Sequence, residues 1–157
     1  MQSRTYKWFE IQDNIAYFEE FETQKIVYPD IAQSPKFLWD DSKSYLGNTA
    51  YFVPTDEIWL VGLLNSKALW WFYGTITSLI RGGFVRYFSQ YMEQLPIPTA
   101  TDTQQAPIIE RVRQIIADPY GPETPRLEAE IDQLVYALYG LTREEIALVE
   151  GTYAAAG

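Results

Sequence analysis

The stretch from Ile58 to Ile80 constrains this fold more than any other, because its 23 residues contain a single charged side chain, Lys67. A segment this apolar has to be buried, either in a protein core or in a membrane. Lys67 follows Asn65 and Ser66 near the middle of the stretch, where a charge costs about 2.5–3.5 kcal/mol on insertion into a bilayer. We therefore expect a pair of buried helices, broken at Asn65-Ser66, rather than a membrane span.

Short segments on both sides of this stretch are typical of β-strands. They are rich in aromatic and β-branched residues and are separated by turn-forming loops. The predicted strands are Tyr6–Ile11, Lys25–Tyr28 with Pro29 as its stop, Phe37–Trp39, Tyr51–Val53 and Phe84–Phe88. The last of them follows Gly82 and Gly83, which predict a tight turn. Short strands with such loops favour a mixed or antiparallel sheet.

The last third of the chain is predicted to be helical. Residues 99–105 have the composition of a polar linker, and an apolar stripe predicts a helix that starts near Pro107 and ends at Asp118. A second helix is predicted with Thr124 as its N-cap and Gly140 as its stop. Residues 142–145 (Thr-Arg-Glu-Glu) match the capping box of a last helix. The predicted fold class is α+β, a small mixed or antiparallel sheet packed on buried helices and followed by a C-terminal helical extension.

The chain contains no histidine and no cysteine. A Ser-His-Asp triad, a zinc site with histidine ligands and thiolate chemistry are therefore excluded within this chain. Pro29-Asp30 followed by Asp41-Ser42-Lys43 loosely matches a nuclease pattern, in which two carboxylates hold Mg²⁺ and a lysine positions the attacking water. A strand end and a turn explain the same residues, so a free-standing nuclease of the PD-(D/E)xK type is only an alternative.

The net charge of −9 is unevenly distributed. Residues 1–99 carry 8 basic and 11 acidic side chains, whereas residues 100–157 carry 4 and 10. Binding to nucleic-acid phosphates requires Lys and Arg, so the overall charge favours a module that binds protein and no DNA. Locally, Arg81, Arg86 and Gln90 flank the glycine turn, and these side chains can read guanine and adenine. A turn flanked by one solvated and one ion-paired arginine explains the same cluster without DNA.

Seven short motifs occur together here in a fixed order. They are Tyr6-Lys7-Trp8-Phe9-Glu10, Lys25-Ile26-Val27-Tyr28-Pro29-Asp30-Ile31, Asn48-Thr49, Leu63-Leu64-Asn65-Ser66-Lys67, Arg81-Gly82-Gly83, Gln90-Tyr91 and Gln94-Leu95-Pro96-Ile97-Pro98. In this order and spacing they resemble the TaqI-like C-terminal specificity domain. The tail at 130–150 resembles the helical end that often follows that domain, so the resemblance covers roughly residues 5–150.

The resemblance implies that residues 1–98 form a target-recognition domain, with an earlier part upstream, and that residues 99–157 form a helical extension. Such domains end type IIG restriction-modification enzymes and adenine-specific DNA methyltransferases. The other domains of those enzymes bind S-adenosylmethionine and, in some of them, Mg²⁺, so this chain is expected to be non-catalytic and to hold no cofactor. Its expected partners are double-stranded DNA and a methyltransferase domain, with no membrane, in bacterial or archaeal cytoplasm.

Side-chain chemistry and loop position select six candidate DNA contacts. They are Lys36, Lys43, Asn48, Arg81, Arg86 and Gln90, with Arg86 and Gln90 as candidate base readers. No catalytic and no metal-binding residue is predicted. The protein-interaction module and the free-standing nuclease stay open as alternatives.

Overall fold

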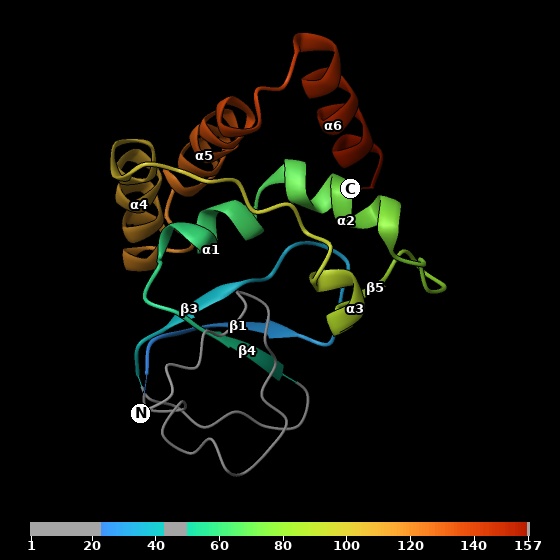
Figure 1. The fold of residues 1–157 in the computed structure, drawn as a ribbon, viewed down its shortest axis with the longest axis horizontal. Helices are drawn as coiled ribbons and strands as arrows, with labels where there is room; N and C mark the ends of the chain where they lie inside the picture. The colour runs from blue at the N-terminus through green and yellow to red at the C-terminus, as the bar shows by residue number, and fades with distance from the viewer. Residues whose placement is uncertain (1–22, 43–49, 157) are drawn as a thin grey trace.

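The computed structural model of the chain describes residues 23–42 and 50–156. Within those ranges it contains β1 (Lys25–Pro29), β2 (Ile31–Ala32), β3 (Leu38–Asp40), β4 (Ala50–Pro54), α1 (Trp59–Leu64), α2 (Lys67–Ile76), β5 (Val85–Arg86), α3 (Ser89–Met92), α4 (Asp102–Ala117), α5 (Thr124–Tyr139) and α6 (Arg143–Ala156). Figure 1 shows the main sheet on one side of α1 and α2, and the C-terminal helices on the other. The predicted α+β class is confirmed.

The main sheet is antiparallel, with β1 between β3 and β4. Ile26 of β1 pairs with Trp39 on one side and with Val53 on the other. The predicted strands at 25–28, 37–39 and 51–53 are thus confirmed within one residue at each end. Pro29 is itself the last residue of β1, where it pairs with Ala50. The predicted strand at 6–11 lies outside the described residues.

The strand predicted at 84–88 is shorter than expected. Only Val85 and Arg86 form a ladder, because β2 offers only Ile31 and Ala32 as partners. Phe84 instead makes an isolated bridge back to Ile80. Beyond β5 the chain turns into α3, so the alternation expected over five residues is interrupted.

The break between the two central helices lies where it was predicted. Asn65 is the C-cap of α1, and its side chain bonds to both backbone groups of Phe37: Oδ1 accepts the N–H at 3.0 Å and Nδ2 donates to the carbonyl at 2.7 Å. Nδ2 also donates to the Val61 carbonyl at 2.9 Å. Ser66 is the N-cap of α2, and its hydroxyl accepts the Leu69 N–H. All six residues of α1 are buried.

Helices α4 and α5 pack directly on α1. A Cβ atom on Gly62 would lie 2.8 Å from Ile108 and 3.0 Å from Val112, so glycine is required for this close approach. One hydrophobic core runs from Ile26 in the sheet to Val149 in α6. The boundary between 1–98 and 99–157 stays a prediction about domains, and across it the core is continuous.

The prediction of a polar linker over 99–105 is wrong. Helix α4 begins at Asp102, five residues before Pro107, because Thr101 and Gln104 form a capping box. Pro107 therefore lies inside the helix rather than at its start. The N-cap prediction for Thr124 is also wrong: Thr124 is the first residue of α5, and its hydroxyl donates to the Asp118 carbonyl at 2.9 Å.

The other helix ends follow the predicted chemistry. Gly140 ends α5 in the left-handed conformation, at φ 63°. Thr142 and Glu145 form a reciprocal capping box at the start of α6, with the Thr142 N–H donating to Glu145 Oε2 at 2.7 Å and the Glu145 N–H donating to Thr142 Oγ1 at 3.2 Å. The α4 helix ends at Ala117, just before Asp118.

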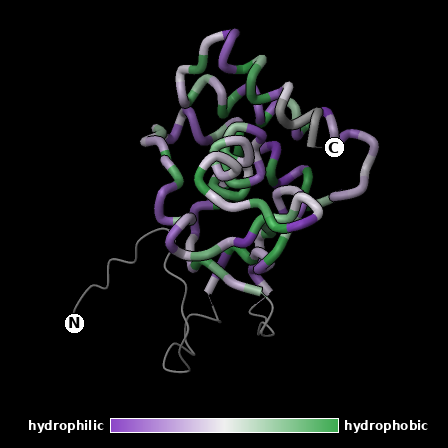
Figure 2. The backbone as a smooth tube through the Cα atoms, turned by 90° about the vertical axis from the view of Figure 1, so that its right-hand side faces the viewer, coloured by the Kyte–Doolittle hydropathy of each residue, from purple (hydrophilic) through white to green (hydrophobic). Residues whose placement is uncertain are grey.

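Hydrophobic segments gather in the centre of the molecule in Figure 2, and hydrophilic segments lie mostly at its periphery. Among the described residues, no helix is both long enough and apolar enough to cross a membrane. The apolar stretch at 58–80 is divided between α1, of 6 residues, and α2, of 10, with the remainder at the start of α1, at the junction of the two helices and in the loop after α2. All of α1 and one face of α2 lie in the protein core, whereas the end of the stretch, at Leu79 and Ile80, is exposed.

We expect Asn65→Ala to lower the free energy of unfolding by roughly 2–3 kcal/mol, because three hydrogen bonds are lost and both backbone groups of Phe37 lose their partner. Asn65→Asp keeps the acceptor for the Phe37 N–H but places a carboxylate oxygen against the Phe37 and Val61 carbonyls, so it should be no more stable than Asn65→Ala. Urea denaturation measures both. Gln114→Ala, at an exposed position of α4, is the control. Equal stability of the Asn65→Ala variant and this control would contradict the role of Asn65.

A second stability prediction concerns Asp132, which lies buried beside Lys67. Its Oδ1 accepts the Lys67 N–H at 2.9 Å, and the Lys67 ammonium lies 3.9 Å from Oδ2. Burial raises the pKa of Asp132 from 3.8 to about 6, against the opposing hydrogen bond and charge of Lys67 and with a contribution from Glu150 and Glu128. The folded state therefore binds this proton more tightly than the unfolded state, and the free energy of unfolding falls as pH rises from about 4 to about 6.

Asp132→Asn removes this titration. Relative to the unchanged chain, the free energy of unfolding of the variant should rise by about 2–3 kcal/mol between pH 4 and pH 7. Urea denaturation at a series of pH values measures the difference. Glu144→Gln, an exposed position on α6, is the charge-matched control and should show no such trend. A difference that stays constant with pH would show that Asp132 titrates normally.

Candidate nucleic-acid interface

A β-hairpin follows α2 and exposes the glycine turn found in the sequence. The Ile80 N–H donates to the Phe84 carbonyl at 2.8 Å, and the Gly83 N–H donates to the Ile80 carbonyl at 3.1 Å. Gly82 and Gly83 have φ values of 94° and 77°. A positive φ at the third position is characteristic of a type II turn, which favours glycine there. The predicted tight turn is confirmed, and it leaves Arg81 exposed at the second position.

This hairpin is anchored to the strand that follows β1. Ile31 pairs with Arg86 and Ala32 pairs with Val85. The side chain of Gln33 then reaches the turn, where Nε2 donates to the Gly82 carbonyl at 3.0 Å. Residues about 50 positions apart in the sequence thus form a single edge.

A cluster of aromatic side chains supports the edge from below. Tyr87 is buried between Tyr28, Phe37 and Tyr73, with ring centroids 5.7, 5.2 and 5.0 Å away. Burial raises the pKa of the Tyr28, Tyr73 and Tyr87 hydroxyls well above the usual value, so all three are neutral. Tyr73 of α2 also donates to the Arg86 carbonyl at 2.5 Å. The core and the edge are therefore directly bonded.

Arg86 is the most constrained of the predicted base readers. Its Nη2 donates to Asp30 Oδ2 at 3.2 Å, and its Cζ lies 5.0 Å from the centre of the Phe88 ring. The side chain is 42% exposed. Arg86 is thus held from two sides and still open to solvent.

The other five predicted DNA contacts lie in different parts of the chain. Arg81 and Gln90 are exposed, Arg81 in the turn and Gln90 on α3 directly after β5. Lys36 is exposed in the loop before β3, next to Phe37, whose ring packs on Tyr87. Lys43 and Asn48 lie outside the described residues. The structure therefore brings Arg81, Arg86 and Gln90 onto neighbouring elements, with Lys36 on an adjoining loop.

Three residues of this edge were not among the sequence-based DNA contacts. Asp30 had been assigned to the nuclease pattern and to one of the family motifs, and Gln33 and Phe88 were not considered as contacts. Phe88 contacts Arg86, two residues before it. The partners of the other two are remote: Gly82 lies 49 residues from Gln33, and Arg86 lies 56 residues from Asp30. No local pattern signals such pairs.

The nuclease pattern is only partly covered by the structure. Asp30 pairs with Arg86, and Asp41 is exposed. Among the described residues, no group of three or more side chains is arranged to hold a metal ion. Lys43, the third residue of the pattern, lies outside those residues, so the nuclease hypothesis stays a prediction.

Exposed apolar side chains lie on the same elements as the arginines. They are Ile31 at 43% exposure, Leu79 at 67%, Ile80 at 39% and Phe88 at 42%. Arginine and glutamine can bond to base edges, and apolar side chains can contact the methyl group of thymine. The edge thus combines the two kinds of contact that a base-reading surface uses.

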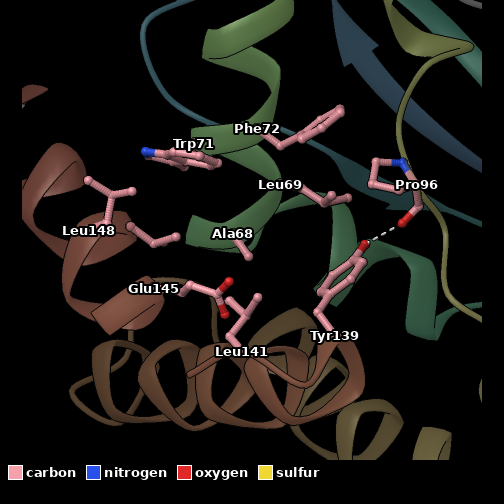
Figure 3. Close-up of a pocket in the computed structure, with 10 residues that line it drawn as sticks. Ala68, Leu69, Trp71, Phe72, Pro96, Tyr139, Leu141, Glu145 and Leu148 are labelled. Atoms are coloured by element: carbon pink, nitrogen blue, oxygen red, sulfur yellow. Dashed lines mark hydrogen bonds between the residues drawn. The ribbon is translucent and has the colours of Figure 1, made fainter. Parts of the chain in front are cut away.

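A separate pocket of about 280 Å³ lies in the helical part of the molecule. Figure 3 shows Leu69, Trp71 and Phe72 of α2 facing Tyr139, Leu141 and Leu148 across it. The Tyr139 hydroxyl closes one end by donating to the Pro96 carbonyl at 2.6 Å. Glu145 provides the one charged lining side chain. This lining suits an apolar group and not a phosphate.

Comparison with known proteins finds one matching domain family and several related methyltransferases. The model of the TaqI-like C-terminal specificity domain matches residues 2–97. The type II methyltransferase M.XhoI of Xanthomonas vasicola is 31% identical over 96 residues, which are 59% of this chain and 17% of that protein.

Two further type II methyltransferases match more of the chain. M.BanIII of Aneurinibacillus aneurinilyticus is 25% identical over 128 residues, which are 76% of this chain and 22% of that protein. M.PaeR7I of Pseudomonas aeruginosa is 28% identical over 131 residues, which are 81% of this chain and 21% of that protein. The chain therefore spans about a fifth of the length of the curated relatives it matches.

The hairpin geometry predicts that Gly82→Ala lowers the free energy of unfolding by roughly 1–2 kcal/mol. The φ of 94° disfavours any side chain, and a Cβ would lie 3.3 Å from the Phe84 ring. Gly74→Ala is the matched control, since it lies on exposed α2 surface with open space for a Cβ. That variant should be as stable as the unchanged chain or slightly more stable. Equal urea midpoints for the two variants would contradict the turn assignment.

Proposed function

The chain belongs to the TaqI-like C-terminal specificity domain family, and on that premise we propose that it selects the DNA sequence on which a bacterial or archaeal adenine-specific methyltransferase, or a type IIG restriction-modification enzyme, acts. The observation that carries the proposal is the family match over residues 2–97, which includes the whole hairpin edge. Catalysis, S-adenosylmethionine and any Mg²⁺ would belong to the other domains of that enzyme.

The chemistry of the edge supports a reading role in spite of the net charge of −9. Reading bases needs only a few polar side chains in a groove, whereas affinity comes mainly from phosphate contacts, which another domain can supply. Arg81, Arg86 and Gln90 are suited to base edges, and Lys36 to a phosphate. Residues 100–157 carry 4 basic and 10 acidic side chains. The helices α4 to α6 of this part of the chain lie on the other side of α1 and α2 from the main sheet (Figure 1).

A protein-interaction module is the second candidate function. It is favoured by the acidic helices and by the apolar pocket between α2 and α6. We assign that helical face to contact with the methyltransferase domain of the same enzyme, so the two functions occupy different parts of the molecule. If the chain acted only through protein contacts, no change in the hairpin would alter DNA recognition.

We expect that Arg81→Ala combined with Arg86→Ala, in the full-length enzyme, lowers the preference for the cognate duplex by at least roughly tenfold, because each good base contact contributes about 1–3 kcal/mol of discrimination. Titration of cognate and unrelated duplexes at several salt concentrations measures this preference. Arg113→Ala combined with Arg143→Ala, two exposed positions on α4 and α6, is the charge-matched control. Cognate preference that survives the first pair unchanged would reject the site.

A segment swap tests the function independently of single residues. Replacing residues 1–98 by the matching segment of a relative that methylates a different sequence should transfer the sequence preference of that relative. Replacing residues 99–157 alone should leave the preference unchanged. Sequencing of methylated sites measures both. An unchanged preference after the first swap would reject the proposed function.

A further inference from the structure

Asp30 and Phe88 hold the guanidinium of Arg86 in place, and we propose that they position it to read a single guanine through two parallel hydrogen bonds. This inference rests on the proposed function and deepens it, because it names the reading residue, its two positioning residues and the base. The contacts that carry it are the 3.2 Å ion pair with Asp30 and the 5.0 Å approach to the Phe88 ring.

The backbones of Asp30 and Arg86 are fixed relative to each other. The Tyr87 N–H donates to the Asp30 carbonyl at 3.0 Å, and Ile31, the next residue after Asp30, pairs with Arg86 across the ladder. Tyr73 donates to the Arg86 carbonyl from below at 2.5 Å. The side chain of Arg86 therefore starts from a defined point.

The guanidinium keeps part of its hydrogen-bonding capacity for a ligand. An arginine has five N–H donors, one on Nε and two on each Nη. Nε is buried and has no hydrogen-bond partner within the described part of the chain, and Nη2 uses one hydrogen on Asp30. The two hydrogens of Nη1 and the second hydrogen of Nη2 remain as donors, on a side chain that is 42% exposed. Two parallel donors of this kind match O6 and N7 of guanine in the major groove.

The charge of Asp30 distinguishes guanine from phosphate as the ligand. A carboxylate beside Arg86 repels a phosphate and offsets the attraction of the arginine, whereas the edge of guanine is neutral. A phosphate contact also needs only a positive charge, which exposed Arg81 and Lys36 can supply without a fixed orientation. Orienting Arg86 before binding reduces the entropy lost on binding, and this benefits a contact that depends on direction.

The guanine-reading role of Arg86 is tested in the full-length methyltransferase that contains this chain, by measuring the base preference at each position of the DNA target. The enzyme is incubated with a plasmid library randomised over the target, and methylated sites are sequenced. Arg86→Lys keeps the charge and removes the fork, so the preference for guanine at one position should fall by roughly 5- to 150-fold. Asp30→Asn and Phe88→Leu keep the guanidinium of Arg86 but each removes one of the contacts that orient it. They should lower the preference for guanine at the same position by a smaller factor, about 2- to 10-fold.

Two matched controls accompany these variants. Arg113→Lys changes an exposed arginine on α4, and Asp56→Asn changes an exposed carboxylate before α1. Both should leave every base preference unchanged. Because base preference is a ratio within one sample, a loss of folded protein lowers methylation of all sequences equally and does not imitate the expected result.

The inference is overturned if Arg86→Lys and Asp30→Asn reduce methylation of all sequences by the same factor, since that pattern belongs to a phosphate contact or to a structural ion pair. It is also overturned if the two variants alter different positions of the target. The swap of residues 1–98 separates this failure from that of the proposed function. A swap that changes the recognised sequence, with no effect of the Arg86 and Asp30 variants, rejects the reader alone; a swap without effect rejects the function as well.

Discussion

The hydrogen bonds of Asn65 and its two neighbours hold the three parts of this molecule together. Asn65 bonds to both backbone groups of Phe37 and so ties the sheet region to the end of α1. Ser66 starts α2 in a new direction, and the Lys67 N–H bonds to Asp132 in α5. Three consecutive residues thus join the sheet, the central helices and the C-terminal helices. Hydrophobic burial stabilises each layer, but these directional bonds set how the layers are oriented.

The orientation of α2 in turn sets the position of the hairpin. Tyr73 extends from α2 to the Arg86 carbonyl, and Phe37, which Asn65 holds by its backbone, packs on Tyr87. The exposed edge therefore rests on a short chain of contacts that begins at the helix junction. Arg81 and Gln90, two exposed side chains of the edge, take no part in these supporting contacts. Arg86 belongs to both the scaffold and the candidate reading surface: its carbonyl accepts the Tyr73 hydroxyl, whereas its side chain is 42% exposed at the edge.

Features that depend on local chemistry were predicted well from the sequence. The helix break at Asn65-Ser66, the glycine turn and the stop at Gly140 each depend on residues within one turn of the chain. The start of α4 was misplaced because Pro107 was given more weight than the capping box at Thr101, although both signals are local. The role of Asp30 could not have been predicted, since its partner lies 56 residues away and a short motif suggested a metal site instead.

The bond from Tyr73 to Arg86 has a consequence for how such a domain can diverge. It uses the carbonyl of Arg86, and the ladder to Ile31 also uses backbone atoms, so neither requires arginine at position 86. A different side chain could occupy this position while the strand keeps its path, provided that residue 30 changes to suit it. The fold therefore offers an exchangeable pair of positions, through which an altered specificity could be acquired by two substitutions without rebuilding the core.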